Sequence, residues 1–331
     1  MKCHLSHFLG KSVTAFFLIT AGAAAMTQVY AQGFPTHTVK LVVPYSPGGT
    51  ADTLGRMVAA GMQEDLGQSI VVENKTGGGS TIGAAAVARA APDGYTLLLG
   101  SGSTHTVAPV VNKNMQYDPV KDFEPISLIG TTSYVLVVNP DKLPVKSLQE
   151  LIEYGKAHPE KAEYGSTGQG AAVHLTMEMF QTQSGAKFLH VPYRGGAPAM
   201  ADVLAGEIAI TLTTAEQAAL IKSGTLRALA VLGPDRLAPL PDVPTCEEAG
   251  VPDCTFPVWN AVFAPAGTPE PVIARLAGSV EKALAAPEVK QRLIDLGYTP
   301  GTGGAEGLRK RVVEETAFVR STAEAAGVGA N

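Results

Sequence analysis

Two spacings of apolar residues alternate in the sequence from Val39 onward. Val39–Val43 is a short, mostly apolar run, which is typical of a buried strand. The next apolar residues recur three or four positions apart, as on one face of a helix; they are Leu54, Met57, Val58, Met62 and Leu66. This spacing predicts a helix from about Thr50 to Gly67, because glycine readily takes the left-handed conformation that ends helices.

The same alternation of strands and helices continues to the C-terminus. The further predicted strands are Ser69–Glu73, Thr96–Leu99, Val135–Val138, Glu163–Tyr164, Phe188–Val191, Ile208–Leu212 and Leu226–Val231. The further predicted helices are Thr81–Ala90, Leu148–Ala157, Ala172–Gln183, Pro198–Leu204, Ala215–Lys222, Pro271–Ala285, Glu288–Leu296 and Ala305–Ala325. Because a strand-helix-strand order normally forms a parallel sheet covered by helices, the pattern predicts an α/β fold.

The length of 331 residues is large for a single core and sufficient for two lobes. The strand-helix pattern repeats after Val135–Val138, which indicates a second unit. Two segments, Ser127–Val138 and Val258–Phe263, are predicted to carry the chain between the lobes. We therefore assign residues 32–133 to the first lobe, 134–257 to the second, and 258–331 to a return into the first lobe.

Residues 1–31 have the pattern of a secretory signal peptide. Lys2 and Lys11 are basic, no acidic residue occurs, and an apolar run ends in small residues. Cleavage is predicted after Ala31, with Ala25 as the alternative, and would place the protein in the periplasm. An uncleaved membrane anchor is the competing interpretation, but the apolar run is short for a membrane span.

The net charge narrows the possible partners. The formal net charge is −5, whereas nucleic-acid binding needs a basic face, so no nucleic-acid partner is expected.

Cys3 would be lost with the signal peptide, which leaves Cys246 and Cys254. Nearby cysteines often pair in an oxidising compartment, so we expect a disulfide, with two buried thiols as the alternative.

Two glycine-containing loops, Pro44–Gly49 and Gly165–Gly170, each follow a strand and precede a helix. The first N–H groups of a helix lack backbone partners, and the helix dipole attracts anions to them. Such loops lie at the carboxyl ends of strands, where α/β sheets bind ligands. The two loops therefore predict an anion site with one loop from each lobe; tight turns without a ligand are the alternative.

Short motifs also occur in a fixed order along the predicted mature chain. They are Val42–Gly49, Val71–Lys75, Pro92–Leu98, Tyr117–Phe123, Tyr164–Gly168, His190–Gly196, Leu226–Val231, Leu240–Thr245 and Ala264–Pro269. Together they resemble the substrate-binding proteins of tripartite tricarboxylate transporters, the Bug family. The resemblance implies a type II periplasmic-binding-protein fold: two lobes with mixed or parallel sheets, flanked by helices, and a ligand cleft between them.

The resemblance also implies a function and a site. The protein would capture a small organic carboxylate, deliver it to the membrane permease subunits of the transporter, and catalyse no reaction. Main-chain amides and hydroxyls of the two glycine loops would hold the carboxylate, with a third contribution from Ser101–His105. The expected ligand contacts are Tyr45, Ser46, Gly48, Gly49, Thr50, Asp52, Ser101, Ser103, Thr104, His105, Ser166, Thr167, Gly168, Gln169, Gly170, Ala171, Arg194, Gly195 and Thr213.

The sequence departs from the family pattern at two places. Ala171 and Ala172 stand where the second loop of relatives often continues with a hydroxyl residue. Many relatives carry an aspartate, which can pair with a ligand amine, after the strand that ends here in Leu212-Thr213-Thr214. Its absence argues against an amino-acid ligand and for a simple carboxylate.

Two other functions remain as alternatives. A ligand sensor for a membrane signalling partner would need the same cleft. An exported hydrolase would need a nucleophile, a base and an acid, but the sequence has no Gly-x-Ser-x-Gly elbow beside its Ser–His cluster at Ser101–His105. The histidines show no metal-ligand spacing, so neither a metal nor a cofactor is expected. A monomer is expected.

Overall fold

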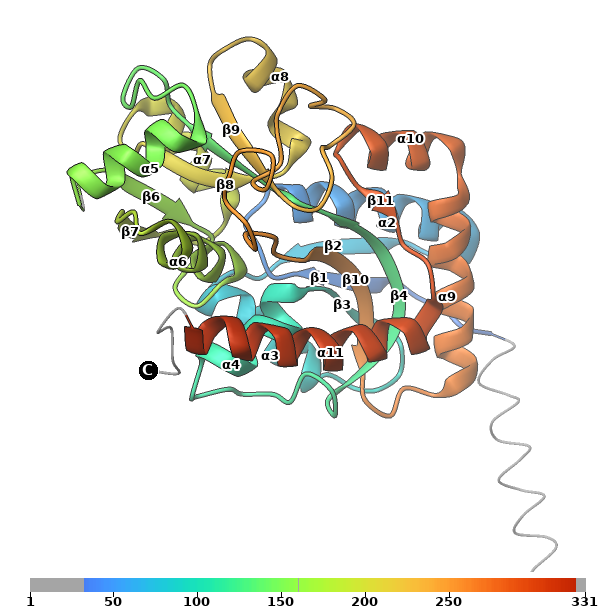
Figure 1. Cartoon of the computed structure of the whole chain (residues 1–331). Helices are drawn as coiled ribbons and strands as arrows, with labels where there is room; N and C mark the ends of the chain where they lie inside the picture. The colour runs from blue at the N-terminus through green and yellow to red at the C-terminus, as the bar shows by residue number, and fades with distance from the viewer. Residues whose placement is uncertain (1–32, 160, 326–331) are drawn as a thin grey trace, which may run out of the picture.

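The computed structural model describes residues 33–159 and 161–325. These residues form a six-stranded sheet with the order β11-β4-β10-β3-β1-β2 and a five-stranded sheet with the order β7-β6-β8-β5-β9. Figure 1 shows the two sheets in separate halves of the molecule, each with its own helices. We call the half around the six-stranded sheet lobe 1 and the half around the five-stranded sheet lobe 2. The predicted signal peptide lies outside the described residues.

Lobe 1 combines parallel and antiparallel strands. Its strands are β1 (Val39–Val43), β2 (Ile70–Asn74), β3 (Thr96–Ser101), β4 (Phe123–Thr132), β10 (Val258–Pro265) and β11 (Thr299–Pro300). Its helices are α2 (Thr50–Leu66), η1 (Gly78–Ser80), α3 (Thr81–Ala88), η2 (Ser103–Val107), α4 (Ala108–Val111), α9 (Glu270–Ala285), α10 (Pro287–Asp295) and α11 (Gly304–Ala325). Strand β1 runs parallel to β2 and β3, and β10 runs antiparallel to β3 and β4.

Lobe 2 is built in the same way. Its strands are β5 (Tyr134–Val138), β6 (Glu163–Ser166), β7 (Leu189–Pro192), β8 (Ile210–Thr213) and β9 (Arg227–Leu232). Its helices are α5 (Leu148–Ala157), α6 (Ala172–Ser184), α7 (Gly196–Ala205), η3 (Ala215–Gln217) and α8 (Ala218–Lys222). Strand β6 runs parallel to β7 and β8, and β5 runs antiparallel to β8 and β9. The predicted α/β fold with mixed sheets and flanking helices is confirmed.

Alternating residues along the strands supply two apolar faces, because successive side chains of a strand point to opposite sides of the sheet. In lobe 1, Leu41 packs in the core that also holds Met62 of α2 and Leu276 of α9. Its neighbour Val42 packs on the other face, in the core that holds Leu308 of α11. Figure 1 shows α11 running along one side of lobe 1 and α9 at its edge.

The chain crosses between the sheets at two adjacent places. Strand β4 ends at Thr132 and β5 begins at Tyr134, so Ser133 is the first crossing point. The chain returns to lobe 1 before Val258, the first residue of β10, which pairs with Thr132. The two connections therefore leave lobe 1 side by side, which is the arrangement that a hinge requires. The exact domain limits given above stay a prediction.

None of the helices in residues 33–159 and 161–325 combines the length and the apolar character needed to cross a membrane.

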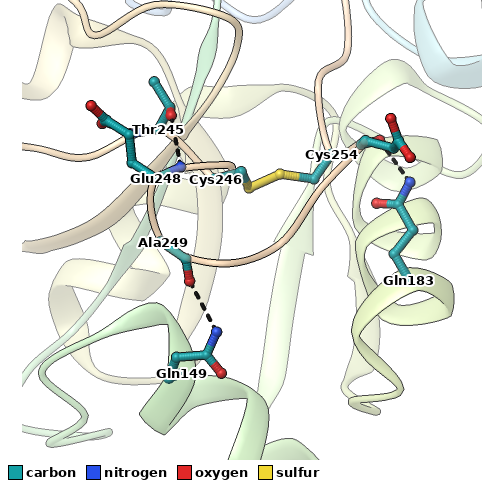
Figure 2. Close-up of a disulfide and its surroundings, with 8 residues drawn as sticks. Gln149, Gln183, Thr245, Cys246, Glu248, Ala249 and Cys254 are labelled. Carbon is teal, nitrogen blue, oxygen red and sulfur yellow. Dashed lines mark hydrogen bonds between the residues drawn. A yellow bond between two sulfur atoms is a disulfide. The ribbon is translucent and has the colours of Figure 1, made fainter.

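Cys246 and Cys254 are joined by a disulfide that closes a loop of lobe 2 (Figure 2). Both cysteines are buried in the lobe 2 core. The loop is also held by side chains of two helices: Gln149 of α5 donates to the Ala249 carbonyl at 2.9 Å, and Gln183 of α6 donates to the Asp253 carbonyl at 2.6 Å. The disulfide therefore closes the loop, and the two glutamine hydrogen bonds fix it onto α5 and α6.

Replacing both cysteines with serine should lower the free energy of unfolding by about 2 kcal/mol, because the cross-link restricts the unfolded chain. Urea denaturation of the oxidised wild type and of the Cys246→Ser/Cys254→Ser variant measures this difference. Reduction of the wild type should reproduce the loss. Equal midpoints for the oxidised wild type and the variant would show that the disulfide adds no stability.

Trp259 at the start of β10 is buried and donates its indole N–H to Glu315 Oε1 of α11 at 2.7 Å. Burial raises the pKa of Glu315 to about 6, although the hydrogen bond from Trp259 and the charge of Arg311 act in the opposite direction. The folded protein thus binds this proton more tightly than the unfolded chain does. The stability that protonation contributes is present below about pH 4.5 and is lost as the pH rises through about 6.

Glu315→Gln should therefore reduce the loss of stability between pH 5 and pH 7 by about 1 kcal/mol. Denaturant unfolding at several pH values measures the slope. Glu314→Gln is the matched control, because Glu314 is exposed on the same helix, and it should leave the slope unchanged. A Glu315→Gln slope equal to that of the wild type would contradict this role of burial.

Candidate functional site

A cavity of about 130 Å³ lies between the two lobes. Lobe 1 lines it with Tyr45, Ser46, Gly48, Gly49, Thr50, Ala51, Ser101, Gly102, Ser103, Val258, Trp259, Asn260 and Tyr298. Lobe 2 lines it with Thr167, Ala172, Val173, Gly196, Ala197, Met200, Thr211, Leu212, Thr213, Thr214, Glu216 and Gln217, and the crossing segments add Tyr134 and Pro257. Hydroxyl groups and small residues therefore dominate the wall.

Three helices begin at this cavity. The first residues of α2 (Thr50 and Ala51), of α6 (Ala172 and Val173) and of α7 (Gly196 and Ala197) all line it. Each helix start presents N–H groups without intrahelical partners and the positive end of a dipole. The three starts together make the cavity attractive to an anion.

The sequence leaves these helix starts without side-chain caps. The N-cap residues are Gly49 for α2, Ala171 for α6 and Gly195 for α7, and none of them accepts a hydrogen bond through a side chain. In α5, by contrast, Ser147 accepts from the Glu150 amide in the usual way. Helices α3, α4 and α8 also lack side-chain caps, but each continues directly from a short η turn. Helices α9 and α10 lack them as well, but a proline in the first turn removes one free donor from each.

A buried aspartate shapes the first glycine loop. Asp52 accepts hydrogen bonds from the Gly48 amide at 3.0 Å, from Asn74 at 2.9 Å and from Arg56 at 3.0 Å. Asn74 also donates to the Tyr45 carbonyl at 3.0 Å. Burial raises the pKa of Asp52, but these hydrogen bonds and the Arg56 charge outweigh it and lower the pKa below its ordinary value. The ionised carboxylate thereby fixes the loop on β2 and α2.

The lobes meet around the cavity through small residues and hydroxyls. Ser103 Oγ of lobe 1 accepts from the Ala172 amide of lobe 2 at 3.1 Å. A Cβ on Gly195 would lie 2.2 Å from Ser46 Oγ, so only glycine permits this approach. A Cβ on Gly79 would likewise lie 2.8 Å from the Gln169 carbonyl oxygen. The second glycine loop thus packs on Gly79, while Gly195 is the residue that faces the first loop.

An acidic side chain also joins the lobes at the cavity. Glu216 of η3 accepts hydrogen bonds from the hydroxyls of Thr50 and Thr53 of α2. Thr50 Oγ1 lies 3.1 Å from Thr214 Oγ1 as well. Burial raises the pKa of Glu216, while the two threonine hydrogen bonds lower it to a smaller extent.

About half of the residues predicted as ligand contacts line the cavity. They are Tyr45, Ser46, Gly48, Gly49, Thr50, Ser101, Ser103, Thr167 and Thr213. Tyr45 and Ser101 are also joined to each other, with their hydroxyl oxygens 2.7 Å apart. The first loop, the end of β3 and the start of α6 are thus brought together.

The other predicted residues lie behind the wall or outside it. They are Asp52, Thr104, His105, Ser166, Gly168, Gln169, Gly170, Ala171, Arg194 and Gly195. Arg194 is exposed, and Ser166 is buried against His190, with Ser166 Oγ 2.6 Å from His190 Nε2. His105 is stacked on Phe263 with a centroid distance of 3.9 Å, and burial lowers its pKa to about 3. His105 is therefore a neutral core residue.

Sequence reasoning missed the parts of the wall that come from α7, η3 and β10. Gly196 and Ala197 open α7 directly after the Arg-Gly turn, and the predicted helix began only at Pro198. Glu216 lies beyond the end of β8, and its direction depends on the short η3 turn. Trp259 and Asn260 were assigned to a crossing segment, and the lobe geometry alone brings them to the cavity.

No group of three or more His, Cys, Asp or Glu side chains placed to hold a metal occurs within the described residues.

Comparison with known proteins agrees with this architecture. A family model described as the tripartite tricarboxylate transporter family receptor matches residues 54–327. The chain is 37% identical over 306 residues to Protein BugT of Bordetella pertussis, covering 92% of this chain and 93% of that protein.

Two solved structures are similar over nearly their whole length. The structure of R. palustris Rpa4515 with adipate has a TM-score of 0.86 and 35% identity, covering 90% of this chain and 100% of that one. The structure of MatC (Rpa3494) from Rhodopseudomonas palustris with bound malate has a TM-score of 0.84 and 32% identity, covering 87% of this chain and 99% of that one.

Two α/β lobes around one cavity place the chain among the two-lobed periplasmic binding proteins. Within that class, it belongs to the tripartite tricarboxylate transporter receptor family, which includes the Bug proteins. Members of this family are substrate-binding proteins, and the chain is accordingly not an enzyme.

Replacing Asp52 with alanine should weaken binding of a ligand in this cavity by about tenfold, because the Gly48 amide and the Tyr45 carbonyl lose their shared support. Arg56→Ala is the matched control: Arg56 touches the same carboxylate from the exposed side and should change affinity less than threefold. Isothermal titration of both variants with a carboxylate that binds the wild type measures this. Equal losses in the two variants would show that Asp52 does not position the loop.

Proposed function

We propose that the protein captures a small organic carboxylate between its lobes and delivers it to the membrane permease of a tripartite tricarboxylate transporter. The observation that carries the proposal is the convergence of α2, α6 and α7 on one cavity. A carboxylate has two oxygens that accept several hydrogen bonds, so it suits a cluster of free N–H donors.

The wall chemistry supports a ligand of this kind. Serine, threonine and tyrosine hydroxyls alternate with apolar surface from Met200, Leu212 and Val258. Hydroxyls orient a polar group, and apolar side chains accept a short carbon chain. Two solved structures that are 35% and 32% identical to this chain hold adipate and malate, which are both small organic acids with two carboxylate groups.

Closure follows from the position of the donors. Helix α2 belongs to lobe 1, whereas α6 and α7 belong to lobe 2, so a carboxylate between them bonds to both lobes at once. Such a ligand binds the closed state more tightly than the open one and shifts the population toward closure. The paired strands β4 and β10 beside the crossing points would act as the hinge. The permease would then recognise the closed form.

The setting of this function is the periplasm. The family comprises periplasmic binding proteins, and residues 1–31 have the charge and apolar pattern of a signal peptide. We propose cleavage after Ala31 and a monomeric mature protein. The Cys246–Cys254 disulfide suits an oxidising compartment.

A screen of mono-, di- and aromatic carboxylates should identify compounds that raise the melting temperature of the wild type. A ligand at about 100 times its Kd should stabilise the protein by about 2.7 kcal/mol. Trp259 lies in the cavity wall, so its fluorescence should change in the same titration. Failure of every carboxylate in the screen to bind would refute the proposed function.

A matched pair of variants separates charge from size. Ala197 lies in the first turn of α7 and lines the cavity. Ala197→Asp adds a negative charge there and should weaken carboxylate binding by at least tenfold, while Ala197→Asn, of nearly equal size, should weaken it less. Equal effects of the two variants would mean that the cavity does not hold an anion.

A further inference from the structure

Glu216 stands apart from the rest of the cavity wall. Among the described residues that line the cavity, it is the only one with a carboxyl, guanidinium, ammonium or imidazole group. Its Oε1 and Oε2 accept from Thr53 and Thr50 of the opposite lobe. A site built for anions thus contains one acid and no basic side chain within the described part of the chain.

No lysine, arginine or histidine of residues 33–159 and 161–325 forms an ion pair with this acid. The charge of Arg292 of α10 lowers the pKa of Glu216, but the Arg292 side chain is exposed and no ion pair joins the two residues. Arg56 is engaged with Asp52, and Arg194 is exposed and does not line the cavity. The negative charge of Glu216 is therefore opposed mainly by hydroxyls and helix ends.

The helix ends can balance only a limited charge. Each helix N-terminus acts as roughly half a positive unit charge. Glu216 bonds to Thr50, the first residue of α2, so it already occupies part of the positive field of that helix. The positive field that remains at the three helix starts suits about one carboxylate group.

We propose that Glu216 sets the charge class of the ligand: one carboxylate at the helix starts, with a neutral or cationic hydrogen-bond donor instead of a second carboxylate at the far end. The assignment rests on the proposed function and narrows it, and it sets this chain apart from the two similar proteins whose structures hold the di-acids adipate and malate. The absence of an aspartate directly after β8 argues against a ligand amine only if no other acid reaches the cavity. Glu216 supplies an acid a few positions further along the chain, and a second carboxylate on the ligand would meet it in a poorly hydrated wall.

Three acids of equal length test the assignment: adipate, its monoamide and 6-aminohexanoate, together with the four-carbon series succinate, succinamate and 4-aminobutyrate. Within a series, the carbon chain has the same length and only the far group differs: it is anionic, neutral or cationic. Titration calorimetry should show that the wild type binds the monoamide or the amino acid at least tenfold more tightly than the di-acid. Glu216→Gln keeps the side-chain shape and an acceptor oxygen, and should reduce this preference to within about threefold.

Thr53→Val provides the control for a purely mechanical role. It removes one hydrogen bond between Glu216 and α2 without changing the charge, and Thr53 does not line the cavity. If Glu216 acts through charge, Thr53→Val should change all three affinities of a series by the same factor and preserve their order. A melting temperature for each variant confirms that it is folded.

The outcomes distinguish this assignment from the proposed function. If the di-acid binds the wild type as tightly as the monoamide, or if Glu216→Gln changes all three affinities equally, the role of Glu216 is refuted while carboxylate capture stands. If no member of either series binds the wild type or the Glu216→Gln variant, carboxylate capture fails and the charge assignment fails with it.

Discussion

The structure depends on backbone N–H groups at three helix starts that have no partner within the helix and no side-chain cap. A helix normally satisfies its first amides with a side-chain cap, but glycine or alanine stands at the cap of α2, α6 and α7. Those starts line one cavity and come from both lobes. The missing caps weaken each helix a little, and a bound anion would supply the same hydrogen bonds from outside.

Other features of the molecule maintain this arrangement. Asp52 and Asn74 hold the first glycine loop, and glycine at position 195 lets the lobes approach closely. Strands β4 and β10 pair beside the two crossing points, so the lobes share a narrow connection. Glu216 places a negative charge against the same cavity, so the site combines attraction for one anionic group with resistance to a second.

Much of the fold could be predicted because strands and helices leave different apolar spacings. The helix at Leu148–Ala157 and the glycine ending α2 at Gly67 were predicted from local pattern alone. The long strand β4 and the π-helical turn Ser103–Val107 were not, because antiparallel pairing with β10 and burial against Phe263 involve distant residues. Tyr45 and Thr50 could be placed at the site because they lie in or beside the first glycine loop. Glu216 and Trp259 lie outside both glycine loops, and only the arrangement of the lobes brings them to the cavity.

The most direct test is a crystal structure of the protein with a carboxylate found in the screen. If the helix starts hold the ligand, its carboxylate oxygens will lie within about 3 Å of main-chain nitrogens from both lobes, at the first turns of at least two of α2, α6 and α7. A carboxylate bound instead through an arginine or lysine outside this cavity would contradict the role assigned to these amides.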